Sequence, residues 1–124
     1  MKQLALVIVG GGIGSGLRYL VSAYLNPLFS GFYLGTITVN IIGCLIIGLL
    51  FGVSLRQEFI NPVQSSFFVT GICGGFTTFS TFGLEQFLLI REGNYTHVLL
   101  YTFGSLILGV LAVGLGFWLA RYLS

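Results

Sequence analysis

Four long apolar stretches take up most of the chain, and charged side chains are nearly absent from them. They cover residues 3–24, 32–55, 63–90 and 98–119, with short polar segments between them. A helix needs roughly 20 apolar residues to cross the hydrocarbon core of a bilayer, so each stretch is long enough to span a membrane. Charged residues make up 6% of the chain, whereas soluble domains carry about 25%. The sequence therefore predicts an all-α membrane protein with four transmembrane helices in a single domain, residues 1–124.

Several classes of protein are excluded by the same features. The net charge of +2 comes without a basic patch, which argues against binding to nucleic acid. Cys44 and Cys73 lie inside apolar stretches, so we expect buried thiols and no disulfide framework. No soluble segment is long enough to form a catalytic domain, and we predict that the chain is not an enzyme.

The third stretch is too long for one straight span. Residues 63–90 would reach about 42 Å as a helix, against a hydrocarbon core of ~30 Å. Gly74 and Gly75, followed by Thr77 and Thr78, place poor helix formers near its middle. We expect the third helix to be broken there, with the freed backbone groups facing protein, water or an ion. An intact helix that packs closely through its glycines is the alternative.

Residues 74–82 combine phenyl rings and hydroxyls in an uncharged segment. Phe79 and Phe82 are three residues apart and share a face if the segment is helical. The positive edge of an aromatic ring can meet an anion without a formal charge, and hydroxyls can donate hydrogen bonds to the same anion. Four hydroxyls are available, those of Thr77, Thr78, Ser80 and Thr81. In the alternative interpretation, the hydroxyls bond to carbonyls one turn earlier and the rings face lipid.

Two other spans carry polar side chains at helical spacing. Thr36 and Asn40 are four residues apart in the second stretch and share a face. The Asn40 amide must face the protein interior, where it either donates to an anion or joins helices. Tyr101, Ser105 and Gly109 form a comparable stripe in the fourth stretch.

Arg18 and Glu85 are the charges that lie deepest in the spans. Each falls a few residues before the end of its stretch, and the first and third spans run in the same direction, so both sit at similar depth. The two side chains can form an ion pair, which lowers the cost of burial. Alternatively, Arg18 reaches water with its long side chain or draws anions into a vestibule. The sequence leaves these alternatives open.

The connections between spans are short, so we expect consecutive spans to be antiparallel neighbours. With this alternation, Lys2, Arg56 and Arg121 lie on one side of the membrane, and Arg18 and Arg91 lie on the other. A membrane protein inserts with the excess of Lys and Arg near its span ends on the cytoplasmic side. Three such residues on one side and two on the other give only a weak bias. We therefore predict insertion in both orientations, with two opposed copies pairing as an antiparallel dimer.

Three segments together resemble the Fluc/CrcB family of fluoride channels. They are residues 11–19 (GGIGSGLRY), residues 35–43 (GTITVNIIG) and residues 70–82 (TGICGGFTTFSTF), in that order along the chain. The resemblance implies a dual-topology dimer with two pores that passively exports fluoride across the cell's inner membrane and so relieves its toxicity. The partners it implies are the fluoride ion, the lipid bilayer and a second copy of the chain.

The resemblance also assigns roles to residues at matching positions. Asn40 and the rings of Phe79 and Phe82 would line the fluoride pathway, whose polar track would include Ser80, Thr81, Tyr101 and Ser105. The backbone carbonyls of Gly74 and Thr77 from both subunits would hold a structural Na+ at the dimer centre. Arg18 and Glu85 also match family positions. Gly83 and Gly109 stand where members often have serine, which removes hydroxyls from the track.

Two alternatives belong to other functional classes. A proton-coupled exporter similar to the small multidrug resistance family has four spans and dual topology, but it needs a carboxylate embedded in the membrane. The first span here contains no acid, and Glu85 lies near a span end. An inactive paralogue that works only with a partner chain is the other alternative.

Overall fold

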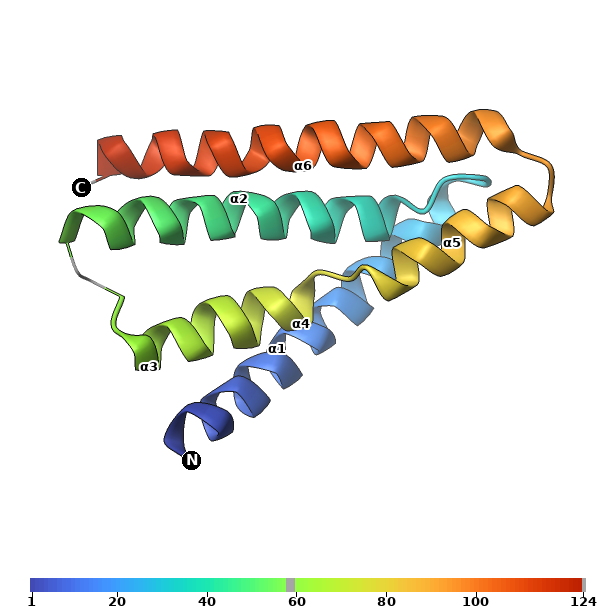
Figure 1. The fold of residues 1–124 in the computed structure, drawn as a ribbon. Coiled ribbons are helices and arrows are strands. Elements are labelled where there is room, and N and C mark those ends of the chain that lie inside the picture. Colours follow the sequence, from blue (N-terminus) through green and yellow to red (C-terminus); the bar gives the residue numbers. More distant parts are fainter. Residues whose placement is uncertain (58–59, 124) are drawn as a thin grey trace.

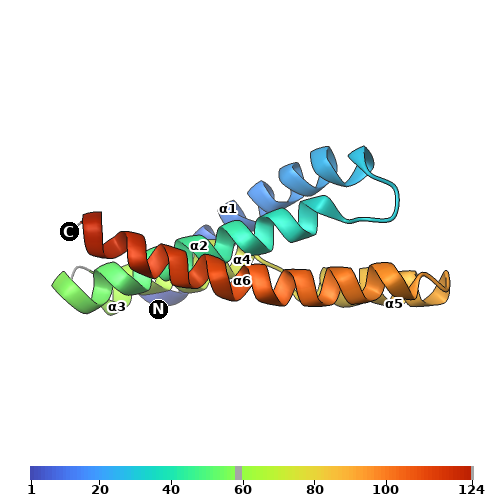
Figure 2. The same ribbon diagram turned by 90° about the horizontal axis from the view of Figure 1, so that it is seen from above.

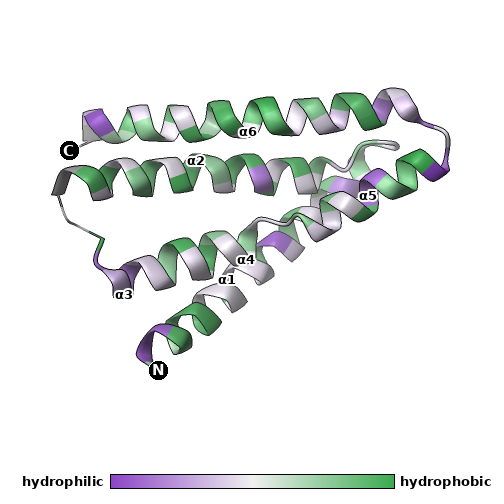
Figure 3. Cartoon of the chain, in the orientation of Figure 1, coloured by the Kyte–Doolittle hydropathy of each residue, from purple (hydrophilic) through white to green (hydrophobic). Residues whose placement is uncertain are grey.

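The computed structural model describes residues 1–57 and 60–123, and every regular element in this part of the chain is helical. Four segments are long and apolar enough to cross a membrane, Lys2–Leu28, Leu34–Leu55, Pro62–Arg91 and Tyr95–Tyr122. Apolar residues cover most of their length (Figure 3). The predicted number of spans is therefore confirmed. The elements are α1 (Lys2–Leu25), η1 (Asn26–Leu28), α2 (Leu34–Gln57), α3 (Pro62–Ser65), η2 (Ser66–Cys73), α4 (Gly74–Phe76), α5 (Ser80–Arg91) and α6 (Tyr95–Leu123).

Local sequence signals set where the helices begin and end. The Asn61 side chain accepts from the Gln64 backbone N–H, and the Gln64 side chain accepts from the Asn61 N–H, which forms a capping box at the start of α3. At the end of α5, Gly93 has a φ of +75° and begins the turn into α6. The Gly93 N–H donates to Ile90 O and the Asn94 N–H donates to Leu89 O, the two bonds of a Schellman motif.

The third span is not one continuous α-helix. The capping box starts α3, the backbone then widens into the π-helix η2, and α4 ends at Phe76. Thr77 is extended, with φ −82° and ψ 160°, and α5 begins only at Ser80. The predicted break is therefore present, but it falls on Thr77 to Phe79, while Gly74 and Gly75 remain helical.

The spans alternate in direction as predicted, but the closest neighbours are not consecutive spans. In Figure 1, α2 lies along α6, and α1 crosses behind the first half of the third span. The α2–α6 and α1–η2 pairs have the most extensive packing in the described part of the chain. Figure 2 shows that the end of α1 diverges from α5 and α6. Consecutive spans contact one another as expected, α1 with α2 and α5 with α6, but spans of the same direction pack most closely.

Glycines explain this pairing. A Cβ on Gly10 would lie 2.6 Å from Phe67 O, and one on Gly75 would lie 2.5 Å from Gly11 O. A Cβ on Gly52, on the other side of the bundle, would lie 2.6 Å from the Cβ of Ala120. These distances are shorter than van der Waals contact, so the helices approach this closely only because the positions lack side chains.

Candidate ion pathway

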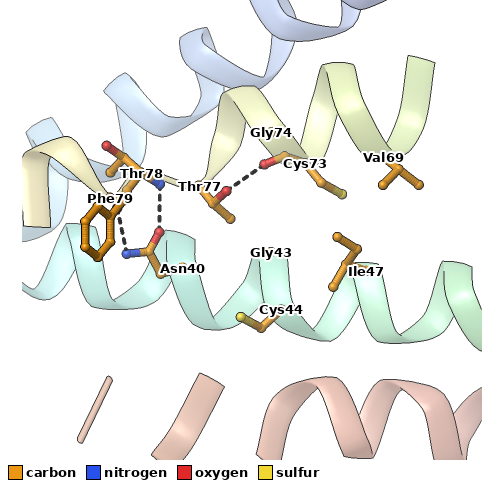
Figure 4. A pocket seen from close by; sticks show the side chains of 10 residues that line it. All are labelled: Asn40, Gly43, Cys44, Ile47, Val69, Cys73, Gly74, Thr77, Thr78 and Phe79. Atoms are coloured by element: carbon orange, nitrogen blue, oxygen red, sulfur yellow. Dashed lines mark hydrogen bonds between the residues drawn. The ribbon is translucent and has the colours of Figure 1, made fainter. Parts of the chain in front are cut away.

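Asn40 of α2 closes the break in the third span. Its Oδ1 accepts from the Thr78 backbone N–H at 2.8 Å, and its Nδ2 donates to Thr78 O at 3.1 Å. Figure 4 shows the Asn40 side chain pointing from α2 at this backbone. Both bonds satisfy backbone groups that the break would otherwise leave exposed at membrane depth. Of the two roles considered for Asn40, the structure shows the one that joins helices.

The break also releases carbonyls from helical bonding, among them Gly74 O and Thr77 O. In a continuing helix the Thr78 N–H would donate to Gly74 O, and the Thr81 N–H would donate to Thr77 O. Here the Thr78 N–H donates to Asn40 Oδ1, and the Thr81 N–H donates to Thr78 Oγ1 at 3.3 Å. Gly74 O and Thr77 O thus lose the donors that a regular helix would supply.

The hydroxyls of the break divide into two groups. Thr77 Oγ1 donates to Cys73 O at 2.9 Å, the bond one turn back that the sequence analysis weighed as an alternative. Thr78 Oγ1 instead lies 3.1 Å from Thr81 Oγ1, to which it donates, and 3.5 Å from Ser80 Oγ. Thr78, Ser80 and Thr81 therefore gather their hydroxyls at the N-terminal end of α5, where the helix dipole favours negative charge.

Aromatic rings continue from the break along the bundle. The ring centroids of Phe79 and Phe82 are 6.1 Å apart, and Phe82 meets Tyr101 edge-on at 4.9 Å. Tyr33 lies 6.3 Å beyond Tyr101. We call these four rings, Phe79, Phe82, Tyr101 and Tyr33, the aromatic line. It runs from the break towards the end of the bundle where α5 turns into α6.

Glu85 is fixed beside the aromatic line by two hydroxyls. Thr36 Oγ1 donates to Glu85 Oε1 at 2.7 Å, and the Tyr101 hydroxyl donates to Oε2 at 2.6 Å. Glu85 is only 4% exposed. The site thus joins α2, α5 and α6 through one carboxyl group.

A pocket of about 450 Å³ opens beside Glu85, and Tyr33 and Glu92 are among its lining residues. Burial, followed by the charges of Glu85 and Glu92, raises the pKa of Tyr33 above its ordinary value.

Arg18 and Glu85 use different partners. The Arg18 Nε donates to Gly75 O at 3.1 Å, so the arginine contacts the segment just before the break. It also lines a pocket of about 220 Å³ in which hydroxyls predominate, with Ser15, Tyr19, Ser22, Thr78 and Thr81. Within the described residues Arg18 and Glu85 form no ion pair, while access to water and attraction of anions both stay predictions for Arg18.

Two polar side chains near the site, those of Thr36 and Gln86, were not predicted to be part of it. Thr36 donates a hydrogen bond to Glu85. Its spacing of four residues from Asn40 had indicated that the two side chains share a face of the second span. The polar atoms of Gln86 are buried on α5 with no hydrogen-bond partner in the described part of the chain. The same is true of Ser105 Oγ, one turn beyond Tyr101 on α6. A Cβ at Gly109 would lie 3.5 Å from Cys44 Sγ, an ordinary contact.

The break faces an open pocket between α2 and the third span. The pocket has a volume of about 450 Å³, and its lining includes Asn40, Gly43, Gly74, Thr77 and Phe79 (Figure 4). Phe79 is 84% exposed in the single chain, although it begins the aromatic line. One chain alone therefore leaves this end of the line uncovered.

Comparison with known proteins gives a consistent result over nearly the whole chain. A family model described as CrcB-like protein, Camphor Resistance (CrcB), matches residues 5–117. A fluoride-specific ion channel FluC of Azobacteroides pseudotrichonymphae is 46% identical over 98% of both chains. Proteins of the same name from Chlorobium chlorochromatii and Escherichia coli are 43% and 45% identical, over 98% and 96% of this chain and 95% and 94% of their own lengths. The chain therefore belongs to the CrcB-like family.

Proposed function

We propose that this protein is a fluoride-specific ion channel of the membrane. The observation that carries the proposal is the broken third span, where hydroxyls and the aromatic line meet at membrane depth. Relatives that match nearly the full chain are named as fluoride-specific ion channels. Donor groups replace the water that a small anion loses, and the lack of a fixed positive charge along the line lets the ion leave again.

The pathway follows the aromatic line. Fluoride meets the hydroxyls of Ser80 and Thr81 at the break, passes the edges of Phe79 and Phe82, and reaches Tyr101, with Ser105 contributing from α6. Asn40 acts mainly by holding the backbone of the break, and one N–H of its Nδ2 remains for the ion. Arg18 attracts anions into the small hydroxyl-lined pocket. Transport is passive, and it exports fluoride from the cytoplasm across the inner membrane.

The working unit is an antiparallel dimer with two pores. The exposure of Phe79 and the open pocket beside the break support a second copy that covers this face. The weak bias in Lys and Arg between the two ends of the bundle supports insertion in both orientations. A reporter fused to the C-terminus should be detected on both faces of the membrane, and detection on one face alone would refute dual topology.

A structural Na+ is proposed at the centre of this dimer. Gly74 O and Thr77 O, released by the break, are hard oxygen ligands of the kind such cations prefer. Among residues 1–57 and 60–123 no three His, Cys, Asp or Glu side chains gather to hold a metal, so the backbone would be the source of ligands. The ion would neutralise these carbonyls and join the two copies without being transported.

The test is efflux from liposomes that contain this chain alone. We expect fluoride to leave rapidly and chloride to stay, each followed with an ion-selective electrode. Equal chloride efflux would refute selectivity. No fluoride efflux would refute a channel made from this chain alone and would point to a paralogue as an obligate partner. Fluoride efflux that requires a proton gradient would instead favour a proton-coupled exporter.

A further inference from the structure

Gln86 is a polar residue of α5 that is not part of the pathway proposed above. Both of its side-chain polar atoms, Nε2 and Oε1, are buried, and neither has a hydrogen-bond partner within the described residues. Its neighbour Glu85, in contrast, accepts two hydrogen bonds. An unpaired buried carboxamide costs free energy, and inside a membrane no bulk water relieves that cost. A bound ligand would supply the hydrogen-bond partners that Gln86 lacks within the described residues.

The spacing along α5 places Gln86 in register with the aromatic line. It follows Phe82 by four residues and Phe79 by seven, so all three lie on one stripe of the helix. Four residues correspond to ~6 Å along the axis. Gln86 thus lies one turn beyond the Phe82 ring, in the direction of the turn into α6.

Ser105 lies on the opposite side of the Phe82–Tyr101 ring pair. It follows Tyr101 by four residues on α6, and α6 runs antiparallel to α5, so Ser105 lies on the side of Phe82 away from Gln86. Its Oγ is also buried and unpaired in the described part of the chain. The edge-on contact of Phe82 and Tyr101 is therefore flanked along the bundle by two buried donors, and neither has a hydrogen-bond partner among residues 1–57 and 60–123.

We propose that Gln86 Nε2 donates a hydrogen bond to fluoride as the ion leaves the Phe82 ring, which makes Gln86 a further residue of the pathway. This inference rests on the proposed function. A carboxamide suits the position because its N–H groups replace water around the ion, while the absence of charge allows release. Oε1 can accept from a water molecule that rehydrates the ion on its way out.

The test compares Gln86→Met with Gln86→Glu in liposomes. Methionine has a similar length but no N–H donor, and glutamate replaces the donor with a carboxylate that repels the anion. We expect fluoride efflux to fall about tenfold to a hundredfold for Gln86→Met, as for a lost hydrogen bond to a charged group, and at least as far for Gln86→Glu. The melting temperature of Gln86→Met should be unchanged or higher, because it removes an unpaired buried polar group.

Phe87→Met is the matched control on the same helix, since Phe87 is largely exposed and lines none of the pockets described above. Its efflux should equal that of the wild type. Wild-type efflux in Gln86→Met would refute the assignment of Gln86, and reduced efflux accompanied by a lower melting temperature would show a structural role and refute it as well. A wild-type chain that passes no fluoride would refute the proposed function and this inference with it.

Discussion

Asn40 and Thr78 exchange two hydrogen bonds, so that one side chain of α2 replaces both backbone bonds that Thr78 would make in a continuous helix. An asparagine presents an acceptor and a donor side by side, which matches the C=O and N–H of a single residue. This match explains how a break can persist at membrane depth, where water is not available to the backbone. The geometry of the candidate pathway depends on this pair.

Asn40→Asp should therefore disable the protein although it changes one atom of the side chain. Ionised aspartate can still accept from the Thr78 N–H, but its second carboxylate oxygen faces the Thr78 carbonyl and has no proton to donate. The variant is therefore measured at alkaline pH, where aspartate is ionised. We expect the free energy of unfolding in detergent to fall by about 1–3 kcal/mol, and fluoride efflux to be lost. Asn61→Asp is the control, because aspartate caps a helix as well as asparagine does. Similar losses in the two variants would contradict the role given to Asn40.

The two hydroxyl donors of Glu85 lead to a prediction about coupling. Thr36→Val and Tyr101→Phe each remove one bond to the carboxyl group, and each should lower the free energy of unfolding by about 1–3 kcal/mol. Glu85→Gln retains one acceptor oxygen, so it can satisfy one of the two hydroxyls. Tyr101→Phe combined with Glu85→Gln should then cost less than the sum of the single changes, by about 0.5–3 kcal/mol. Strict additivity in unfolding experiments would show that the two side chains act independently.

The sequence predicted the number of spans, the break and the aromatic stripe because each follows from local spacing. Length, hydropathy and the poor helix formers around Gly74 are sufficient for these features. The fine position of the break was not predictable, because it depends on the distant residue Asn40. The partners of Arg18 and Glu85 depend in the same way on how the helices pack.

Phe79 and Phe82 should respond differently to substitution by isoleucine. Phe82 packs edge-on against Tyr101, so Phe82→Ile should lower the free energy of unfolding by about 1 kcal/mol and also reduce fluoride efflux several-fold. Phe79 is mostly exposed in the single chain, and Phe79→Ile should reduce efflux with little effect on the stability of that chain. Assembly of the proposed dimer, measured by cross-linking, should survive both changes. Unchanged efflux in both variants would remove the aromatic line from the mechanism.

Gly75 and Gly114 provide a matched pair that tests how α1 positions the break. A Cβ at Gly75 would lie 2.5 Å from Gly11 O and 3.0 Å from Gly11 Cα, and backbone atoms cannot move aside without separating the helices. Nothing lies within 4 Å of a Cβ at Gly114, which is in the interior of α6. We expect Gly75→Ala to lower the free energy of unfolding by about 1–3 kcal/mol and Gly114→Ala to raise it by roughly 0.5–1 kcal/mol. Because α4 leads directly into Thr77, separation of α1 from α4 should also displace the break and reduce fluoride efflux in Gly75→Ala alone. Equal efflux in the two variants would show that the break is positioned by α2 through Asn40 and not by α1.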